Sequence, residues 1–206
     1  MSSNPTLKRI DSIDVLRGIV MVIMALDHVR DFVHDQAYTG DPLNVLTTTP
    51  VLYITRWITH LCAPTFVFLS GLSIYLQSIR KSKAELSSFL FKRGIWLIFV
   101  ELVLISLAIT FNPFYNLIVL QVIWAIGISM IILGFLSRLP YKVVLAIGLV
   151  IVLGHNVLDF WEAEPGFKAG FWWDLFHHGL FAVYPIVGDH YLAIMYPFVP
   201  WTGLMI

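Results

Sequence analysis

The stretch SIDVLRGIVMVIMALDHVRDFVHD, residues 12–35, decides the fold class of this chain. It is an apolar run long enough to cross a bilayer, which takes about 20 residues in a helix. The same run carries ionisable side chains at Asp14, Arg17, Asp27, His28, Arg30, Asp31 and His34. Such groups are costly at bilayer depth and usually face a bundle interior or a hydrated cavity. The stretch therefore predicts a transmembrane helix that lines a functional site.

Helical spacing places several of these groups on one face. Arg17 and His28 are separated by close to three full turns, which puts them on nearly the same side, about 16 Å apart along the axis. Asp14, Arg17, Met21, His28 and Asp31 therefore form a polar stripe, flanked by Asp27 and Arg30. We expect this stripe to line a cleft between helices.

The composition is that of a polytopic membrane protein. The 206 residues are 58% hydrophobic and 13% charged, and the mean hydropathy is +0.82. The formal net charge of zero argues against a general nucleic-acid surface. The single cysteine, Cys62, excludes a disulfide within the chain. We expect an all-α fold, because a helix satisfies its own backbone hydrogen bonds in lipid.

We expect a transmembrane helix bundle with about five complete crossings. They cover about residues 12–35, 51–78, 91–111, 116–136 and 143–160. An interfacial or re-entrant segment at 170–185 and the start of a further, truncated crossing at 193–206 follow. Residues 1–206 are thus expected to form a single domain, the N-terminal part of a longer protein.

The positions of Lys and Arg predict the topology. The N-terminal tail is basic, the loop at 35–50 has no Lys or Arg, and residues 80–93 and 137–142 are basic again. The positive-inside rule therefore places the N-terminus in the cytoplasm, with Arg17 nearer the cytoplasmic end of its helix.

His28 and its acidic neighbours Asp27 and Asp31 have two interpretations. They could form a buried polar network that holds the first helix to the second through Arg56. Alternatively, a carboxylate orients the imidazole as a general base, which acyl transfer to a hydroxyl or amine requires. Arg56 and His60, one turn apart, are expected to be partners of the acids on the first helix.

Other polar groups carry weaker signals. No Walker loop, GxGxxG, CxxC, HExxH or GxSxG pattern occurs, so nucleotide hydrolysis, dinucleotide binding and a standard zinc site have no support. His177 and His178 are adjacent and point in different directions on a helix, so no metal site is expected there. Glu101 could pair with Arg93, but their separation of eight residues favours a group on another helix. Gly71 and Gly127 are expected at close helix contacts.

Three segments carry a family resemblance: RIDSIDVLRGIVMVIMALDHVRDF at 9–32, WITHLCAPTFVFLSGLSIYL at 57–76 and LQVIWAIGISMIIL at 120–133. They resemble bacterial proteins similar to the catalytic domain of heparan-α-glucosaminide N-acetyltransferase. These belong to a superfamily of transmembrane acyltransferases that includes the acyltransferase-three proteins, in which an Arg, ten residues and a His mark the catalytic helix. Arg17 and His28 match that spacing. The lysosomal enzymes are assigned a catalytic His in the loop after this helix, which has none here.

The resemblance implies a membrane-bound O- or N-acyltransferase of the bacterial inner membrane. It would move an acetyl or other acyl group from cytoplasmic acyl-CoA to a sugar or glycan on the extracytoplasmic side. The roles it implies are base or acyl carrier for His28 and binding of the donor's phosphates for Arg17. From the charged residues themselves we add Asp27 and Asp31 as catalytic candidates beside His28, and Arg30, Arg56 and His60 as candidates for donor or substrate binding. The expected partners are the bilayer, acyl-CoA and a carbohydrate acceptor, with no metal and no nucleic acid, and a homodimer is compatible with the sequence.

Two other functions use the same side chains. A proton-coupled transporter or channel would use the Asp and His residues of the first helix as a relay, and would show pH-dependent flux without an acyl donor. A haem-binding electron carrier would use His28 and His60 as axial ligands and would show a Soret band.

Overall fold

The computed structural model describes residues 11–33, 43, 44, 46, 48–179 and 181–206. By its internal contacts the chain divides into an N-terminal unit, residues 1–69, and a C-terminal unit, residues 70–206. Both are mainly helical, and each is described by itself.

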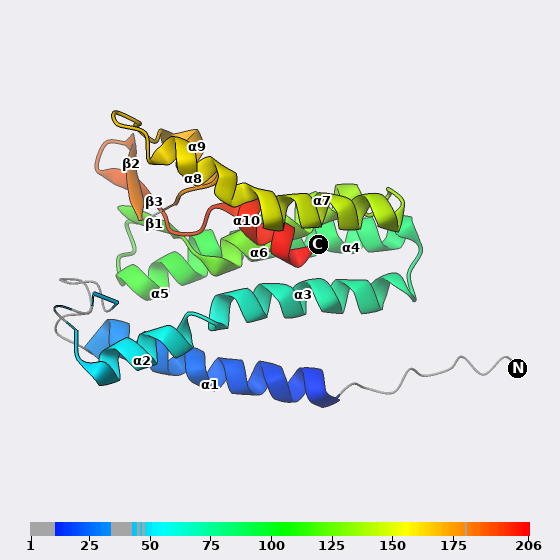
Figure 1. Ribbon diagram of the computed structural model, residues 1–206, viewed down its shortest axis with the longest axis horizontal. Helices are drawn as coiled ribbons and strands as arrows, with labels where there is room; N and C mark the ends of the chain where they lie inside the picture. The colour runs from blue at the N-terminus through cyan, green and yellow to red at the C-terminus, as the bar shows by residue number, and fades with distance from the viewer. Residues whose placement is uncertain (1–10, 34–42, 45, 47, 180) are drawn as a thin grey trace, which may run out of the picture. The chain divides into compact units, whose positions relative to one another are not determined.

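The N-terminal unit contains α1 (Asp11–Val33), α2 (Pro50–Thr59) and the first part of α3 (Cys62–Ser78) (Figure 1). Helices α1 and α2 pack against each other. The side chain of Thr49 caps α2 by accepting a hydrogen bond from the backbone N–H of Leu52, at 3.3 Å.

A break divides the helix that the sequence predicts over residues 51–78. The structure separates α2 from α3 at His60 and Leu61. The physical reason is Pro64, which has no N–H to donate to the carbonyl of His60 four residues earlier. The break allows α2 to follow a direction different from that of α3 (Figure 1).

The C-terminal unit is a group of packed helices with a small sheet at one end (Figure 1). Its helical elements are α4 (Lys83–Phe99), the π-helix η1 (Val100–Ile105), α5 (Ser106–Thr110), α6 (Val122–Leu136), α7 (Tyr141–Gly154), the 3-10 helix η2 (His155–Leu158), α8 (Asp159–Glu162), α9 (Phe171–Phe176) and α10 (Phe198–Met205). Helix α6 packs against α4 and α10, and α10 also packs against α7. Leu86 and Leu90 of α4 and Ala125, Met130 and Leu133 of α6 are buried in this core.

Three strands make the sheet, in the order β1 (Leu117–Leu120), β3 (His190–Ile194) and β2 (Ala182–Val187). Strand β1 is parallel to β3, and β2 is antiparallel to it. The sequence predicts helix over 116–136 and an interfacial helix over 170–185 instead. The all-α expectation is therefore corrected: the fold is mostly helical with one sheet.

Local chemistry explains both departures. An apolar run of four residues such as Leu117–Leu120 fits a helix or a strand equally well, because its periodicity is too short to distinguish them. Between β2 and β3 the turn residues are Gly188 and Asp189, and Gly188 has a φ of +56°. A two-residue Gly-Asp connection between two apolar runs is a sequence signal for a β-hairpin.

Among the described residues, three helical segments are long and apolar enough to cross a membrane: Pro50–Ser78, which is α2 and α3 taken together, Lys83–Thr110 and Tyr141–Glu162. Helix α6 is apolar but has only 15 residues. Helix α1 has 23 residues but carries several charges in its apolar run. The expected five complete crossings are therefore not confirmed.

Close backbone approach joins α4 to α6. A Cβ built on Gly94 would lie 2.6 Å from the carbonyl oxygen of Gly127, and one built on Gly127 would lie 3.0 Å from that of Gly94. The close contact expected at Gly127 is thus confirmed, as is that at Gly71, where a Cβ would meet the carbonyl of Met205. Side-chain-free positions let two helices pack backbone to backbone.

Replacing Gly94 with alanine is expected to destabilise the protein by about 1–3 kcal/mol, because the new methyl group forces α4 away from α6. Gly154→Ala is the matched control, since a Cβ there has no atom within 4 Å. Removing glycine at such an open site usually leaves stability unchanged or raises it. Thermal unfolding in detergent measures both. Equal melting temperatures for Gly94→Ala and wild type would disprove the tight contact.

Candidate functional site

Asp27 is the centre of a charged cluster between α1 and α2. Arg30 Nη2 lies 2.7 Å from Asp27 Oδ1, and Arg56 Nη1 lies 3.2 Å from the same oxygen and 3.4 Å from Oδ2. The hydroxyl of Thr59 donates to Oδ1 at 2.6 Å. We call Asp27, Arg30, Arg56 and Thr59 the Asp27 cluster. The pairing of Arg56 with an acid of the first helix is present as expected.

The Asp27 cluster is electrostatically unbalanced. One carboxylate faces two guanidinium groups, so these four side chains carry one formal positive charge in excess. The exposed fractions are 20% for the side chain of Asp27, 10% for Arg30 and 30% for Arg56. In this arrangement the carboxylate of Asp27 fixes the planes of the two guanidinium groups.

The structure does not bring the other predicted site residues into this cluster. His28 and His60 are exposed, and among the described residues no side-chain hydrogen bond or ion pair joins either to the Asp27 cluster. Arg17 lies nearer the start of α1, with Nη1 3.4 Å from Asp14 Oδ1 and Nη2 3.5 Å from the carbonyl oxygen of Leu69. The backbone of Asp31 belongs to α1, but its side chain lies outside the described part, as does His34.

Glu101 is fully buried in the π-helical turn η1. Its Oε1 accepts a hydrogen bond of 2.7 Å from the backbone N–H of Gln121, at the start of α6. The expected partner on another segment is therefore found. A carboxylate at a helix N-terminus is favourably placed for the helix dipole, and π-helical turns are frequent at functional sites.

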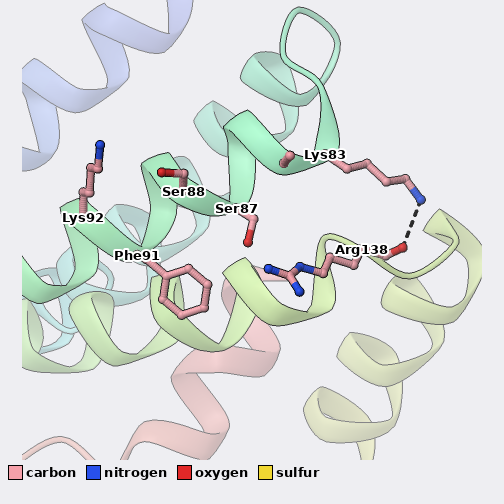
Figure 2. A pocket seen from close by; sticks show the side chains of 7 residues that line it. Lys83, Ser87, Ser88, Phe91, Lys92 and Arg138 are labelled. Carbon is pink, nitrogen blue, oxygen red and sulfur yellow. Dashed lines mark hydrogen bonds between the residues drawn. The ribbon is translucent and has the colours of Figure 1, made fainter.

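A basic pocket lies at the start of α4. It has a volume of about 610 Å³, and its lining residues are Lys83, Ala84, Ser87, Ser88, Phe91, Lys92 and Arg138. Figure 2 shows the cationic side chains at its rim and the ring of Phe91 between them. Lys83 Nζ donates to the carbonyl oxygen of Arg138 at 3.1 Å. The combination of cations and apolar surface fits an amphipathic anion.

A second polar cluster lies at the end of the C-terminal unit that holds the sheet. His177 Nε2 is 3.0 Å from Asp159 Oδ1 and 3.6 Å from Glu162 Oε1. His178 Nδ1 is 3.2 Å from Asp174 Oδ1, and His178 Nε2 is 3.5 Å from Glu162 Oε2. We call these five residues the histidine–carboxylate cluster. One ligand atom each from Asp159, Glu162 and His177 lies within 4.8 Å of the others, a grouping that can hold a metal ion.

The two histidines of this cluster stand out in the sequence, but their carboxylate partners do not. Asp159 and Glu162 precede His177 by a loop whose path the sequence does not reveal. One signal was available, since Asp159 and Glu162 are three residues apart and share one face of a helix.

Tyr184 of β2 donates its hydroxyl hydrogen to Asp174, whose side chain is buried. Burial and this bond to a carboxylate raise the pKa of Tyr184 to about 12. The ordinary value in the unfolded chain is about 10. The pair therefore stabilises the folded protein fully below pH 10, and the stabilisation is lost as the pH rises toward 12.

We expect Tyr184→Phe to remove the part of the alkaline destabilisation that falls between about pH 10 and pH 12. Melting temperatures measured across that range test it. Tyr191→Phe on the neighbouring strand is the control, because that side chain is exposed and, in the described part of the chain, the hydroxyl bonded to Asp174 is that of Tyr184. An alkaline profile of Tyr184→Phe identical to that of wild type would contradict the assigned pair.

Comparison with known proteins bears on these sites. The model of a family described as heparan-alpha-glucosaminide N-acetyltransferase, catalytic, matches residues 9–206. No curated protein and no solved structure gave a match. The match covers α1, the Asp27 cluster, the basic pocket and the histidine–carboxylate cluster. This chain therefore belongs to the family of heparan-alpha-glucosaminide N-acetyltransferase catalytic domains and is an acetyltransferase-like membrane protein.

Proposed function

We propose that the protein transfers an acetyl or other acyl group from acyl-CoA on the cytoplasmic side to a sugar or glycan on the extracytoplasmic side. The observation that carries the proposal is the family match over residues 9–206, which includes the charged helix α1. In this reaction an acceptor hydroxyl or amine attacks the thioester carbonyl. The C–S bond breaks, an ester or amide forms, and coenzyme A leaves as a thiol after taking up the proton that the acceptor loses.

In this proposal His28 is the base or acyl carrier, with Asp27 and Asp31 beside it on α1. The imidazole of His28 is exposed, whereas Asp27 is occupied by Thr59 and the two guanidinium groups. A base near neutral pH is the chemistry that imidazole supplies.

The cationic residues are proposed to bind the donor or the acceptor. Arg30 and Arg56 present their guanidinium groups to Asp27, and His60 lies one turn beyond Arg56. Arg17 is proposed to meet the donor's phosphates, because a guanidinium binds phosphate with two parallel hydrogen bonds.

The charge distribution of the C-terminal unit supports a cytoplasmic donor. The continuous helix Lys83–Thr110 has 28 residues and is about 42 Å long, which exceeds the roughly 30 Å hydrocarbon core. The basic pocket lies at the N-terminal end of this helix, and the sheet lies near its C-terminal end (Figure 1). By the positive-inside rule the pocket faces the cytoplasm, where acyl-CoA is found. The proposal thus places the protein in the inner membrane with its N-terminus in the cytoplasm.

Membrane vesicles of opposite orientation test the proposal. Labelled acetyl-CoA is added outside inverted and right-side-out vesicles that contain the protein and a mixture of saccharides. We expect labelled acceptor only when the donor reaches the cytoplasmic face. A pH-dependent flux of saccharide without acyl donor, with no consumption of thioester, would replace the acyltransferase by a proton-coupled transporter.

A further inference from the structure

We propose that Asp159, Glu162 and His177 form a binding site for a divalent transition-metal ion of the Zn²⁺ class. The three side chains come from two segments that are separated along the chain by a loop. Two lie on α8, at the end of the helix that begins at Tyr141, and the third follows α9. A bound ion would fasten these segments together at the end of the unit that carries the sheet. The inference does not depend on the proposed acyl transfer.

The geometry of the three ligand atoms is close to that of a metal site. Zinc binds imidazole nitrogen and carboxylate oxygen at about 2.0–2.2 Å, so the ligand atoms lie about 3–4 Å from one another. His177 Nε2 is 3.0 Å from Asp159 Oδ1 and 3.6 Å from Glu162 Oε1, and all three atoms lie within 4.8 Å. Small side-chain rotations would complete the site, with a coordination position left for water.

His177 is the buried ligand of the proposed site. Its side chain is only 6% exposed, and its Nδ1 atom is buried without a hydrogen-bond partner among the described residues. Its Nε2 faces the carboxylates of Asp159 and Glu162, and an ion bound there requires the hydrogen on Nδ1, for which no acceptor lies among the described residues. Three electron-rich groups around one point repel one another unless a proton or a metal ion lies between them.

Neighbouring groups fix the ligands in place. Trp173 Nε1 donates to Glu162 Oε1 at 2.6 Å, and His178 Nε2 lies 3.5 Å from the other oxygen of Glu162. The ring of His177 lies edge to face against Trp173 at 5.7 Å and against His155 at 6.0 Å between centroids. Such outer contacts orient metal ligands and raise affinity.

The surrounding charge also favours a cation. The acidic residues between positions 155 and 190 are Asp159, Glu162, Glu164, Asp174 and Asp189, and the only Lys or Arg in that sequence is Lys168. Imidazole favours Zn²⁺ and similar ions over Mg²⁺ and Ca²⁺, which take oxygen ligands. The site is therefore expected to discriminate by ligand type as well as by charge.

Zinc titration of the tag-free protein in detergent, after treatment with a chelator, tests the proposal. We expect one saturable Zn²⁺ per chain and a higher melting temperature with Zn²⁺, but little change with Ca²⁺. Asp159→Ala and His177→Gln are expected to weaken Zn²⁺ binding at least about tenfold. The Asp159 side chain is 61% exposed, so Asp159→Ala removes a ligand without disturbing the core.

Glu164→Gln and His190→Gln are matched controls, because both residues are exposed and lie outside the three-residue site. They are expected to bind Zn²⁺ as the wild type does. Two results would overturn the proposal. One is the absence of saturable Zn²⁺ binding, which would leave a proton as the cation between the three groups. The other is undiminished binding by both Asp159→Ala and His177→Gln, which would place the ion elsewhere.

Discussion

Replacing His28 with alanine is expected to lower the rate of acyl transfer by about 10²–10⁴-fold, the range that a positioned general base contributes. The substitution removes the imidazole proposed to accept the acceptor's proton. His28 is exposed on α1, so the change leaves the packed core intact. The measurement is kcat for release of coenzyme A thiol from acetyl-CoA in the presence of a saccharide acceptor.

His190→Ala is the control for this experiment. His190 is also exposed, lies on β3 and is distant in sequence from the proposed site. It is expected to keep the wild-type rate and to show that loss of an imidazole alone is harmless. If His28→Ala also keeps the wild-type kcat, His28 is neither the base nor the acyl carrier.

Asp27→Asn is expected to destabilise the protein by about 2–3 kcal/mol. This is the low end of the usual cost of removing one partner from a buried ion pair. The low end applies because the Asp27 side chain is 20% exposed. The amide keeps the shape but removes the negative charge that holds Arg30 and Arg56 together. Thermal unfolding in detergent measures the loss, and acyl transfer is expected to fall with it because the guanidinium groups lose their orientation.

Asp11→Asn, at the exposed start of the same helix, is the matched control and is expected to change stability little. A double-mutant cycle with Arg56→Gln separates pairing from folding. We expect a coupling energy between Asp27 and Arg56 of about 0.5–3 kcal/mol. Additive effects of the two substitutions would show that the observed ion pair does not contribute to stability.

The sequence allowed the membrane class and several helix positions to be predicted, because apolar length and helical spacing are local properties. It predicted α1 to within about two residues and the close contact at Gly127. It did not predict the sheet, because β1 pairs with β3, a strand more than 70 residues later in the chain. A run of four apolar residues is too short to show the period of a strand, and nothing local indicates a partner so far along the chain. The break at His60 was in principle visible from Pro64.

The candidate site was predictable in part, because helical spacing is a local property of the sequence. Residues of α1 share a helix, so the spacing of Arg17 and His28 and the neighbourhood of Asp27 and Arg30 follow from the sequence. The pairing of Asp27 with Arg56 needed only an adjacent antiparallel helix. The histidine–carboxylate cluster was not predicted. Its α8 residues and its histidines are brought together by the loop that ends at Gly170, and the sequence does not reveal the path of that loop.

The most direct test of the account is the stoichiometry of acyl transfer by the purified protein in lipid. Coenzyme A thiol and acylated saccharide are measured together over time, with labelled acetyl-CoA as the donor. We predict that the two products appear in equal amounts, only when a saccharide acceptor is present, and that His28→Ala slows both equally. Saccharide that crosses the membrane while acetyl-CoA stays intact would contradict it.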